Sequence, residues 1–257
     1  MPTGVTDPLG RSSSFTYFAN SVIDFEESLL AGETLPEGNA QQLTRDARAN
    51  IIEKRIKAKP GSGLADRVIT ASYPASCSNR KTCNKPDFLI DARGGRTDYT
   101  YDPAHGGILT ETGPADANGI RPQKRYSYAQ QYAMIRNSAG NLVNTATPVW
   151  LLMGISECRT LTSCVGTADE TKTTIVYASN NLLATSTTVS SGDNVLAATT
   201  SQAYDATGNV LTADGPLPGN ADTTRTRYDA LRRIIGVVGP DPDGAGTLPT
   251  SRDAQYL

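Results

Sequence analysis

The residues best suited to chemistry, by type and by spacing, are the four cysteines of this 257-residue chain. Cys77 and Cys83 are separated by five residues, and Cys158 and Cys164 repeat that spacing. Redox motifs usually read Cys-x-x-Cys, and a shared zinc site would need two pairs that lie 81 residues apart in the sequence. We therefore predict two local disulfides, which form in an oxidising compartment. Free thiols and a metal site are the alternatives.

Carboxylates form the second group with catalytic potential. Glycoside hydrolysis needs two carboxyl groups roughly 5–9.5 Å apart, and Asp102, Asp205 and Asp229 qualify by residue type. Each of them stands at a repeated position where a turn needs a side-chain acceptor, so we predict a structural role, no catalytic residue, no metal and no cofactor. The single histidine, His105, is expected on a surface turn. Trp150 is expected to anchor a core, with stacking on a sugar ligand as the alternative.

The elements that must position these residues are repetitive. Three segments begin with Tyr-Asp, continue through a short aliphatic stretch and reach Gly-Pro eleven or twelve residues after the tyrosine. They begin at Tyr101, Tyr204 and Tyr228. Successive repeat tyrosines lie 24 to 28 residues apart, for example Tyr204 to Tyr228 and Tyr228 to Tyr256. That length suffices for two strands and two turns.

A shorter pattern, Asp-x-x-Gly or Asn-x-x-Gly, recurs more often. It begins at Asp7, Asp91, Asp116, Asn137, Asp205 and Asp241 and ends at Gly10, Gly94, Gly119, Gly140, Gly208 and Gly244. Aspartate at the first position of a type I turn accepts backbone hydrogen bonds, and glycine adopts the left-handed conformation that returns the chain. We therefore interpret each copy as the tip of a β-hairpin.

The flanking segments have the alternation of aromatic or β-branched residues with polar ones that is typical of strands. We expect strands within residues 14–18, 97–101, 124–128, 171–177 and 182–200. Residues 45–52 resemble a degraded copy in which Arg45 replaces the tyrosine. Residues 177–183 resemble another that has lost both Asp and Gly. For residues 41–57 the degraded hairpin is preferred, and an amphipathic helix is the alternative.

Composition excludes several classes of function. The net charge is -2 with scattered Lys and Arg, so we expect no nucleic-acid partner. The longest apolar run, residues 149–155, is shorter than the roughly 20 residues that cross a bilayer, so we expect no membrane span. The first residues have neither a basic nor an apolar segment, so we expect no signal peptide.

Together these motifs resemble the YD repeat of the RHS (rearrangement hot spot) family. The pattern Tyr-Asp-x-x-Gly-Asn-x-Leu-Thr is found at residues 204–212. Residues 7–17, 91–101 and 225–233 are similar to the other half of the repeat. The resemblance covers nearly the whole chain and is weakest over residues 22–68.

The resemblance implies an all-β fold of tandem antiparallel hairpins that form a curved or spiralling sheet, part of a hollow shell. In bacterial polymorphic toxins and insecticidal toxin complexes such shells enclose a toxin, and in teneurins the repeats belong to a cell-surface ectodomain. The resemblance further implies a non-enzymatic structural segment, secreted or at the cell surface. Its partners would be the rest of a larger polypeptide or its toxin cargo.

We expect one repeat array over residues 1–257, with sub-blocks 1–70, 71–150 and 151–257. The core-boundary segment and toxic domain of toxin-bearing relatives are not found, and the chain stops at the beginning of another repeat. We therefore expect a fragment of a longer protein. Two other functions stay open: a carbohydrate-binding or adhesion module with exposed aromatic residues that hold a cell-surface glycan, and a cryptic hydrolase.

Overall fold

The computed structural model describes residues 3–18 and 29–240, and these residues contain strands and turns but no helix. No segment of that part is therefore a helix able to cross a membrane. The all-β, antiparallel prediction is confirmed. The chain forms two compact units, residues 1–121 and 122–257. The predicted turn at Asp241 and the repeat at Tyr256 lie outside the described residues.

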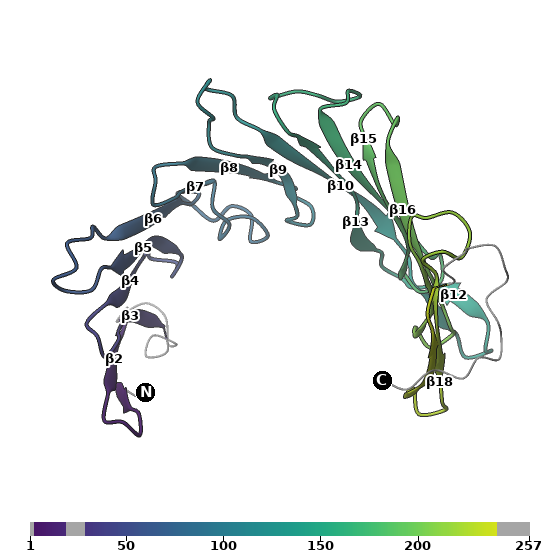
Figure 1. The fold of residues 1–257 in the computed structure, drawn as a ribbon, viewed down its shortest axis with the longest axis horizontal. Helices are drawn as coiled ribbons and strands as arrows, with labels where there is room; N and C mark the ends of the chain where they lie inside the picture. Colours follow the sequence, from purple (N-terminus) through teal and green to yellow (C-terminus); the bar gives the residue numbers. More distant parts are fainter. Residues whose placement is uncertain (1–2, 19–28, 241–257) are drawn as a thin grey trace. The chain divides into compact units, whose positions relative to one another are not determined.

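The first unit is an antiparallel sheet in which each strand pairs with its neighbour in the sequence (Figure 1). Its strands are β1 (Gly4–Thr6), β2 (Ser12–Tyr17), β3 (Leu30–Thr34), β4 (Ala40–Arg45), β5 (Ile51–Lys57), β6 (Arg67–Ser72), β7 (Phe88–Ile90), β8 (Arg96–Tyr101) and β9 (Ile108–Thr112). Residues 41–57 form the β4–β5 hairpin, with Leu43 opposite Lys54. The helix alternative is wrong, because tertiary pairing overrides a helix propensity that differs between residues by only tenths of a kcal/mol.

In the second unit, too, strands that follow one another in the sequence pair antiparallel, except that a separate hairpin is inserted between the first two of them. Its strands are β10 (Gln123–Gln131), β13 (Val149–Cys158), β14 (Glu170–Tyr177), β15 (Ala184–Ser191), β16 (Ala197–Tyr204), β17 (Val210–Asp214), β18 (Thr224–Tyr228) and β19 (Ile234–Val238). Between β10 and β13 the chain forms a separate hairpin of β11 (Met134–Arg136) and β12 (Leu142–Asn144). This insertion lengthens the spacing from Tyr128 to the next repeat tyrosine, Tyr177.

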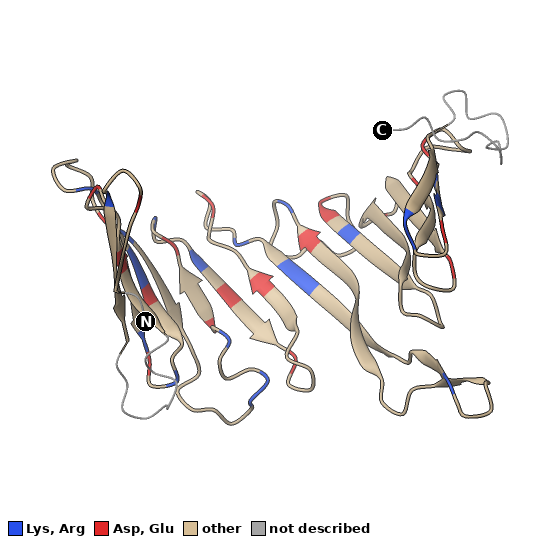
Figure 2. Ribbon diagram, turned by 90° about the horizontal axis from the view of Figure 1, so that it is seen from below, with Lys and Arg blue, Asp and Glu red and all other residues tan. Residues whose placement is uncertain are grey.

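Within residues 3–18 and 29–240, neither unit buries an aliphatic or aromatic core. Among the described residues the buried apolar side chains are those of Cys83, Cys158 and Cys164, whereas Val189, Ile235 and many other large apolar side chains are exposed. Basic and acidic residues are interspersed along the strands and turns (Figure 2). The fold is therefore ordered mainly by its backbone ladder, its turns and its disulfide loops.

Candidate functional site

The hairpin tips are built around one acceptor side chain. In the tip that joins β16 to β17, Asp205 Oδ1 accepts hydrogen bonds from the backbone N–H groups of Thr207 (2.8 Å) and Asn209 (3.0 Å). Gly208, at φ +89°, donates its N–H to the carbonyl of Asp205. The same pair of bonds to residues i+2 and i+4 is found at Asp7, Asp46, Asp91, Asp116, Asn137 and Asp229.

A β-bulge recurs at or near the end of a strand, at a residue that we call the repeat marker, and the tips that begin at Asp46, Asp102, Asp205 and Asp229 directly follow such a marker. The register shifts at Tyr17, Arg45, Tyr101, Tyr128, Tyr177, Tyr204 and Tyr228. A bulge leaves one residue without a cross-strand partner and increases the local twist. The bulge therefore recurs at a fixed place in each repeat and twists the sheet there.

The repeat markers also connect successive repeats. Tyr228 donates its hydroxyl to the carbonyl of Val210 (3.1 Å), the residue that pairs with the preceding marker, Tyr204. Tyr204 in turn donates to Ala184 (2.7 Å), which pairs with Tyr177.

The same rule holds further back in this unit. Tyr177 donates its hydroxyl to the carbonyl of Leu152 (2.9 Å), which pairs with Tyr128. A marker thus bonds to the residue opposite the marker before it.

Arg45 performs this function without a phenol. Its guanidinium donates to the carbonyl of Leu30 (3.4 Å), which pairs with the marker Tyr17, and to Ala49 within its own tip (2.8 Å). Tyr73 then donates to Ile51 (3.3 Å), which pairs with Arg45. Sequence reasoning missed Tyr73 because a disulfide loop replaces its Asp and Gly. The 28-residue spacing of positions 17, 45, 73 and 101 is the signal that would have found it.

The three candidate catalytic carboxylates, Asp102, Asp205 and Asp229, all accept hydrogen bonds inside hairpin tips. The Thr207 hydroxyl and the Asn209 side chain and N–H hold the pKa of Asp205 well below its usual range. Hydrogen bonds from the Arg233 backbone and side chain lower the pKa of Asp229. Asp102 Oδ1 accepts from the N–H of Ala104 (2.7 Å) in a third tip. Each carboxylate thus accepts hydrogen bonds within its own turn.

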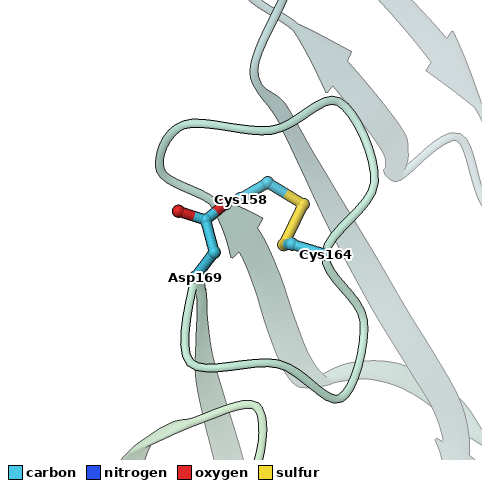
Figure 3. A group of neighbouring side chains, drawn as sticks. All are labelled: Cys158, Cys164 and Asp169. Atoms are coloured by element: carbon cyan, nitrogen blue, oxygen red, sulfur yellow. A yellow bond between two sulfur atoms is a disulfide. The ribbon is translucent and has the colours of Figure 1, made fainter.

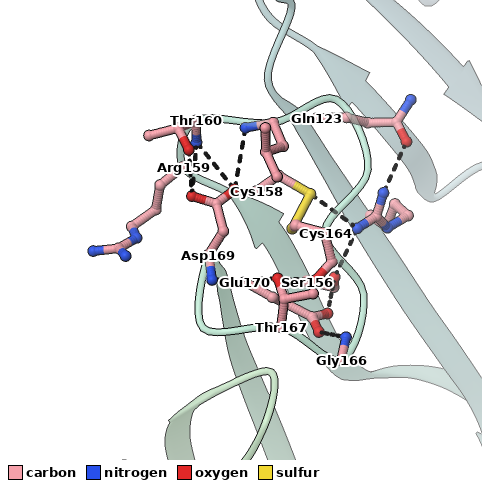
Figure 4. Close-up of a disulfide and its surroundings, with 12 residues drawn as sticks. Gln123, Ser156, Cys158, Arg159, Thr160, Cys164, Gly166, Thr167, Asp169 and Glu170 are labelled. Carbon is pink, nitrogen blue, oxygen red and sulfur yellow. Dashed lines mark hydrogen bonds between the residues drawn. A yellow bond between two sulfur atoms is a disulfide. The ribbon is translucent and has the colours of Figure 1, made fainter.

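A denser polar cluster surrounds the Cys158–Cys164 disulfide, whose Cα atoms lie 5.6 Å apart (Figure 4). Arg125 on β10 donates to Ser156 Oγ (3.2 Å) and lies 3.4 Å from Cys158 Sγ. The Ser156 hydroxyl donates to Glu170, which is 4% exposed and also accepts from the N–H of Gly166 (2.8 Å). The Ser156 hydrogen bond is the main cause that lowers the pKa of Glu170.

This cluster contains the one group of potential metal ligands found among the described residues, namely Cys158, Cys164 and Asp169 (Figure 3). The two sulfurs are joined to each other, so neither is a thiolate that could bind zinc. The carboxylate of Asp169 instead accepts hydrogen bonds from the Thr160 hydroxyl (2.6 Å) and from the N–H of Leu161 (3.1 Å). The donor set fits a closed disulfide loop rather than a metal.

The Cys77–Cys83 disulfide closes a second loop, between β6 and β7, and its Cα atoms lie 4.8 Å apart. Sequence reasoning placed both cysteine pairs in local loops but did not identify what the loops contact. The Cys77–Cys83 loop lies against the tip at 102–107, where Asn79 Nδ2 donates to the carbonyl of Pro103 (2.9 Å). The Cys158–Cys164 loop lies over Glu170 and Ser156.

His105 is within a turn, but its side chain is only 10% exposed. Its Nδ1 accepts from the N–H of Gly107 (3.0 Å), and its Nε2 lies 3.5 Å from the carboxylate of Asp102. The expectation of a surface residue is wrong, because the imidazole is largely buried and accepts a backbone hydrogen bond within its own turn. Trp150 lies on β13 and is 39% exposed, so it is not a fully buried anchor.

Comparison with known proteins gives no family assignment, because no family model and no curated protein matches the chain. Among solved structures, the chain is similar to part of a TcdB2-TccC3-Cdc42 complex (12% identity, TM-score 0.39, covering 89% of this chain and 13% of that one). It is also similar to TcdB2-TccC3 without its hypervariable C-terminal region (14%, TM-score 0.39, 94% and 14%). A porin-like protein from Bacteroides uniformis matches as well (11%, TM-score 0.34, 88% and 86%). The chain thus spans about one seventh of the toxin-complex chains that it matches.

Proposed function

We propose that this chain is a non-enzymatic structural segment of an RHS/YD-repeat shell that encloses a toxin or contributes to a cell-surface interaction. The observation that carries the proposal is the repeat junction, in which Tyr177, Tyr204 and Tyr228 each coincide with a register shift and each bond to the residue opposite the marker before it. A junction that extends by nearest neighbours suits a long wall.

The scarcity of buried apolar side chains supports this function. A single-layer sheet cannot bury both of its faces, and exposed apolar patches mark surfaces that another protein covers. In the proposed shell, the rest of a larger polypeptide or the cargo would cover one face. The two disulfide loops suit a secreted or cell-surface location, because disulfides persist in oxidising compartments.

Cryo-electron microscopy of the complete gene product, purified with the proteins encoded beside it, tests the proposal. We expect the hairpins to form a wall around protein density, and the enclosed polypeptide to resist protease until the wall is unfolded. A free hairpin strip with both faces in solvent and no enclosed or docked polypeptide would contradict it.

A carbohydrate-binding module remains a prediction with a separate test. A glycan array probed with the full chain, and with Trp150→Ala beside it, should show binding that the substitution removes. Turnover of any glycan on the same array would contradict the non-enzymatic assignment.

A further inference from the structure

The disulfide loop between β6 and β7 holds the tip of another hairpin. Three side chains of this loop donate to three carbonyls of the tip at 102–107: Asn79 to Pro103, Lys81 to Ala104 and Lys85 to Gly106. We call residues 77–85 the strap. The ammonium of Lys85 also lies 5.3 Å from the centre of the Tyr101 ring, beside the tip. The strap therefore binds this tip through the ammonium groups of Lys81 and Lys85 and the side-chain amide of Asn79.

The backbone packs as closely as the side chains. Gly106, at φ +78°, is buried, and a Cβ built on it would lie 2.6 Å from the carbonyl oxygen of Lys81. Gly94 at φ +86°, in the preceding hairpin tip, has nothing within 4 Å of that position. Close backbone contact with the strap thus distinguishes the 102–107 tip, which is one residue longer, from the tip at 91–95.

The disulfide shapes the strap for this contact. Within the loop, the N–H of Cys83 donates to the carbonyl of Asn79 (2.9 Å), and the N–H of Lys81 donates to Asn79 Oδ1 (2.9 Å). These bonds orient Asn79 and Lys81 toward the tip. The loop contributes no strand, so the covalent link between Cys77 and Cys83 is its main constraint on conformation.

The two disulfides of the chain differ in their access to solvent. Cys77 is an exposed residue, and its partner Cys83 is 2% exposed. Cys158 and Cys164 are 0% and 2% exposed, and the guanidinium of Arg125 lies against Cys158 Sγ. Thiol–disulfide exchange requires a thiolate to reach one sulfur along the S–S axis, so access decides which bond reacts.

We propose that Cys77–Cys83 is a thiol–disulfide exchange site for dithiol reductants, and that its reduction releases the strap from the 102–107 tip while Cys158–Cys164 stays oxidised. A thiolate of the dithiol attacks the sulfur of Cys77, and Cys83 leaves as a thiolate that takes a proton from water. The second thiol of the reductant then attacks the mixed disulfide and frees Cys77. The protein gains two electrons and two protons, and the dithiol becomes a disulfide.

Timed reduction of the full chain tests the chemistry. The folded protein is incubated with dithiothreitol at pH 8 and quenched with iodoacetamide, and the alkylated cysteine peptides are quantified by mass spectrometry. We expect Cys77 and Cys83 to be alkylated at least about tenfold faster than Cys158 and Cys164, because reaction rates follow access. Equal rates, or faster reaction of the buried pair, would overturn the assignment.

Hydrogen–deuterium exchange tests the release. After selective reduction, amides 103–107 should exchange faster, while the strap-free tip at 205–209 should not change. Unchanged exchange at 103–107, or an equal increase at both tips, would show that the disulfide does not control the strap.

A pair of glycine substitutions tests the contact without reduction. Gly106→Ala and Gly94→Ala both place a side chain at a positive φ, but only the first also collides with the strap. In the oxidised protein, Gly106→Ala should increase exchange over 102–107 more than Gly94→Ala increases it over 91–95. Equal effects would mean that the strap does not pack on the tip.

Discussion

At the scale of single residues, the repeat markers act as hydrogen-bond donors rather than as core side chains. The acceptor is a backbone carbonyl, so the contact requires a donor of suitable reach and not a particular neighbouring side chain. Arg45 illustrates this, since its guanidinium reaches the carbonyl of Leu30 from the position that a tyrosine has elsewhere. Loss of the tyrosine at a repeat therefore does not imply loss of the junction.

Removal of one marker hydroxyl should cost about 1 kcal/mol of stability, the usual net contribution of a protein hydrogen bond. Tyr177→Phe removes the bond to the carbonyl of Leu152 and leaves the ring in place. Urea denaturation followed by circular dichroism would measure the loss. Tyr132→Phe is the matched control, because Tyr132 is 41% exposed and is not a repeat marker. Equal losses for the two variants would contradict the role assigned to the marker.

Alkaline pH should also destabilise the fold around Tyr101, whose hydroxyl donates to the carbonyl of Pro86 (2.9 Å). Burial, with smaller effects from Tyr99 and nearby carboxylates, raises the pKa of Tyr101 to about 12. The folded state then keeps a proton that the unfolded state loses near pH 10, so stability falls as the pH rises from about 10 to about 12. Absorbance titration of tyrosinate should show Tyr101 among the late-titrating phenols, and Tyr101→Phe should reduce the loss of stability in this range. Titration of every tyrosine near pH 10 would refute this.

At the scale of the elements, the tips depend on a left-handed residue that is not always glycine. Ala49, Leu182 and Arg232 have φ values of +65°, +60° and +64°. A residue with a Cβ pays roughly 1–2 kcal/mol in this conformation. These three copies of the repeat thus keep the turn at the expense of local strain.

Glycine at such a position should stabilise the protein. We expect Ala49→Gly to gain up to about 1 kcal/mol, because relief of strain exceeds the added entropy of the unfolded chain. Ala47→Gly, in the same tip but without a positive φ, should be neutral or destabilising. Thermal melts of the two variants and of the unsubstituted protein would measure the difference. A melting temperature of Ala49→Gly below that of the unsubstituted protein would contradict the proposed strain at Ala49.

The elements could be predicted from the sequence where their chemistry is local. The Asp-x-x-Gly tips and the alternating strands require only neighbours in the sequence, and the structure places Asp7, Asp91, Asp116 and Asp205 in such tips. The hydrogen bonds from markers to the preceding repeat could not be predicted from residue types, because the acceptor is a backbone carbonyl, which every residue has. The cluster around Glu170 was missed because Arg125, Ser156 and Glu170 come from three strands.

At the scale of the whole chain, the exposed apolar side chains have a consequence for behaviour in solution. The strand registers place Val189, Leu211, Ile235 and Val237 on one face of β15, β17 and β19, and all four are exposed. Such a face favours association with another apolar surface.

We expect concentration-dependent association of the isolated chain, measured by light scattering coupled to size exclusion. Ile235→Lys should reduce it by placing a charge in the apolar face. Leu9→Lys should not, because Leu9 lies in the β1–β2 tip. A monodisperse monomer at all concentrations would contradict this expectation.

The bond from each marker to the repeat before it also bears on how such a gene can change. The junctions between Tyr177, Tyr204 and Tyr228 are made by equivalent atoms at equivalent places. Deletion of residues 178–204 would join Tyr177 to the tip at 205–209, so that Val210, the acceptor of Tyr228, would take the place opposite Tyr177 that Ala184 now has. Duplication of the same stretch would add a hairpin by the same rule. Recombination in whole repeats would therefore change the length of the protein while leaving each remaining joint intact.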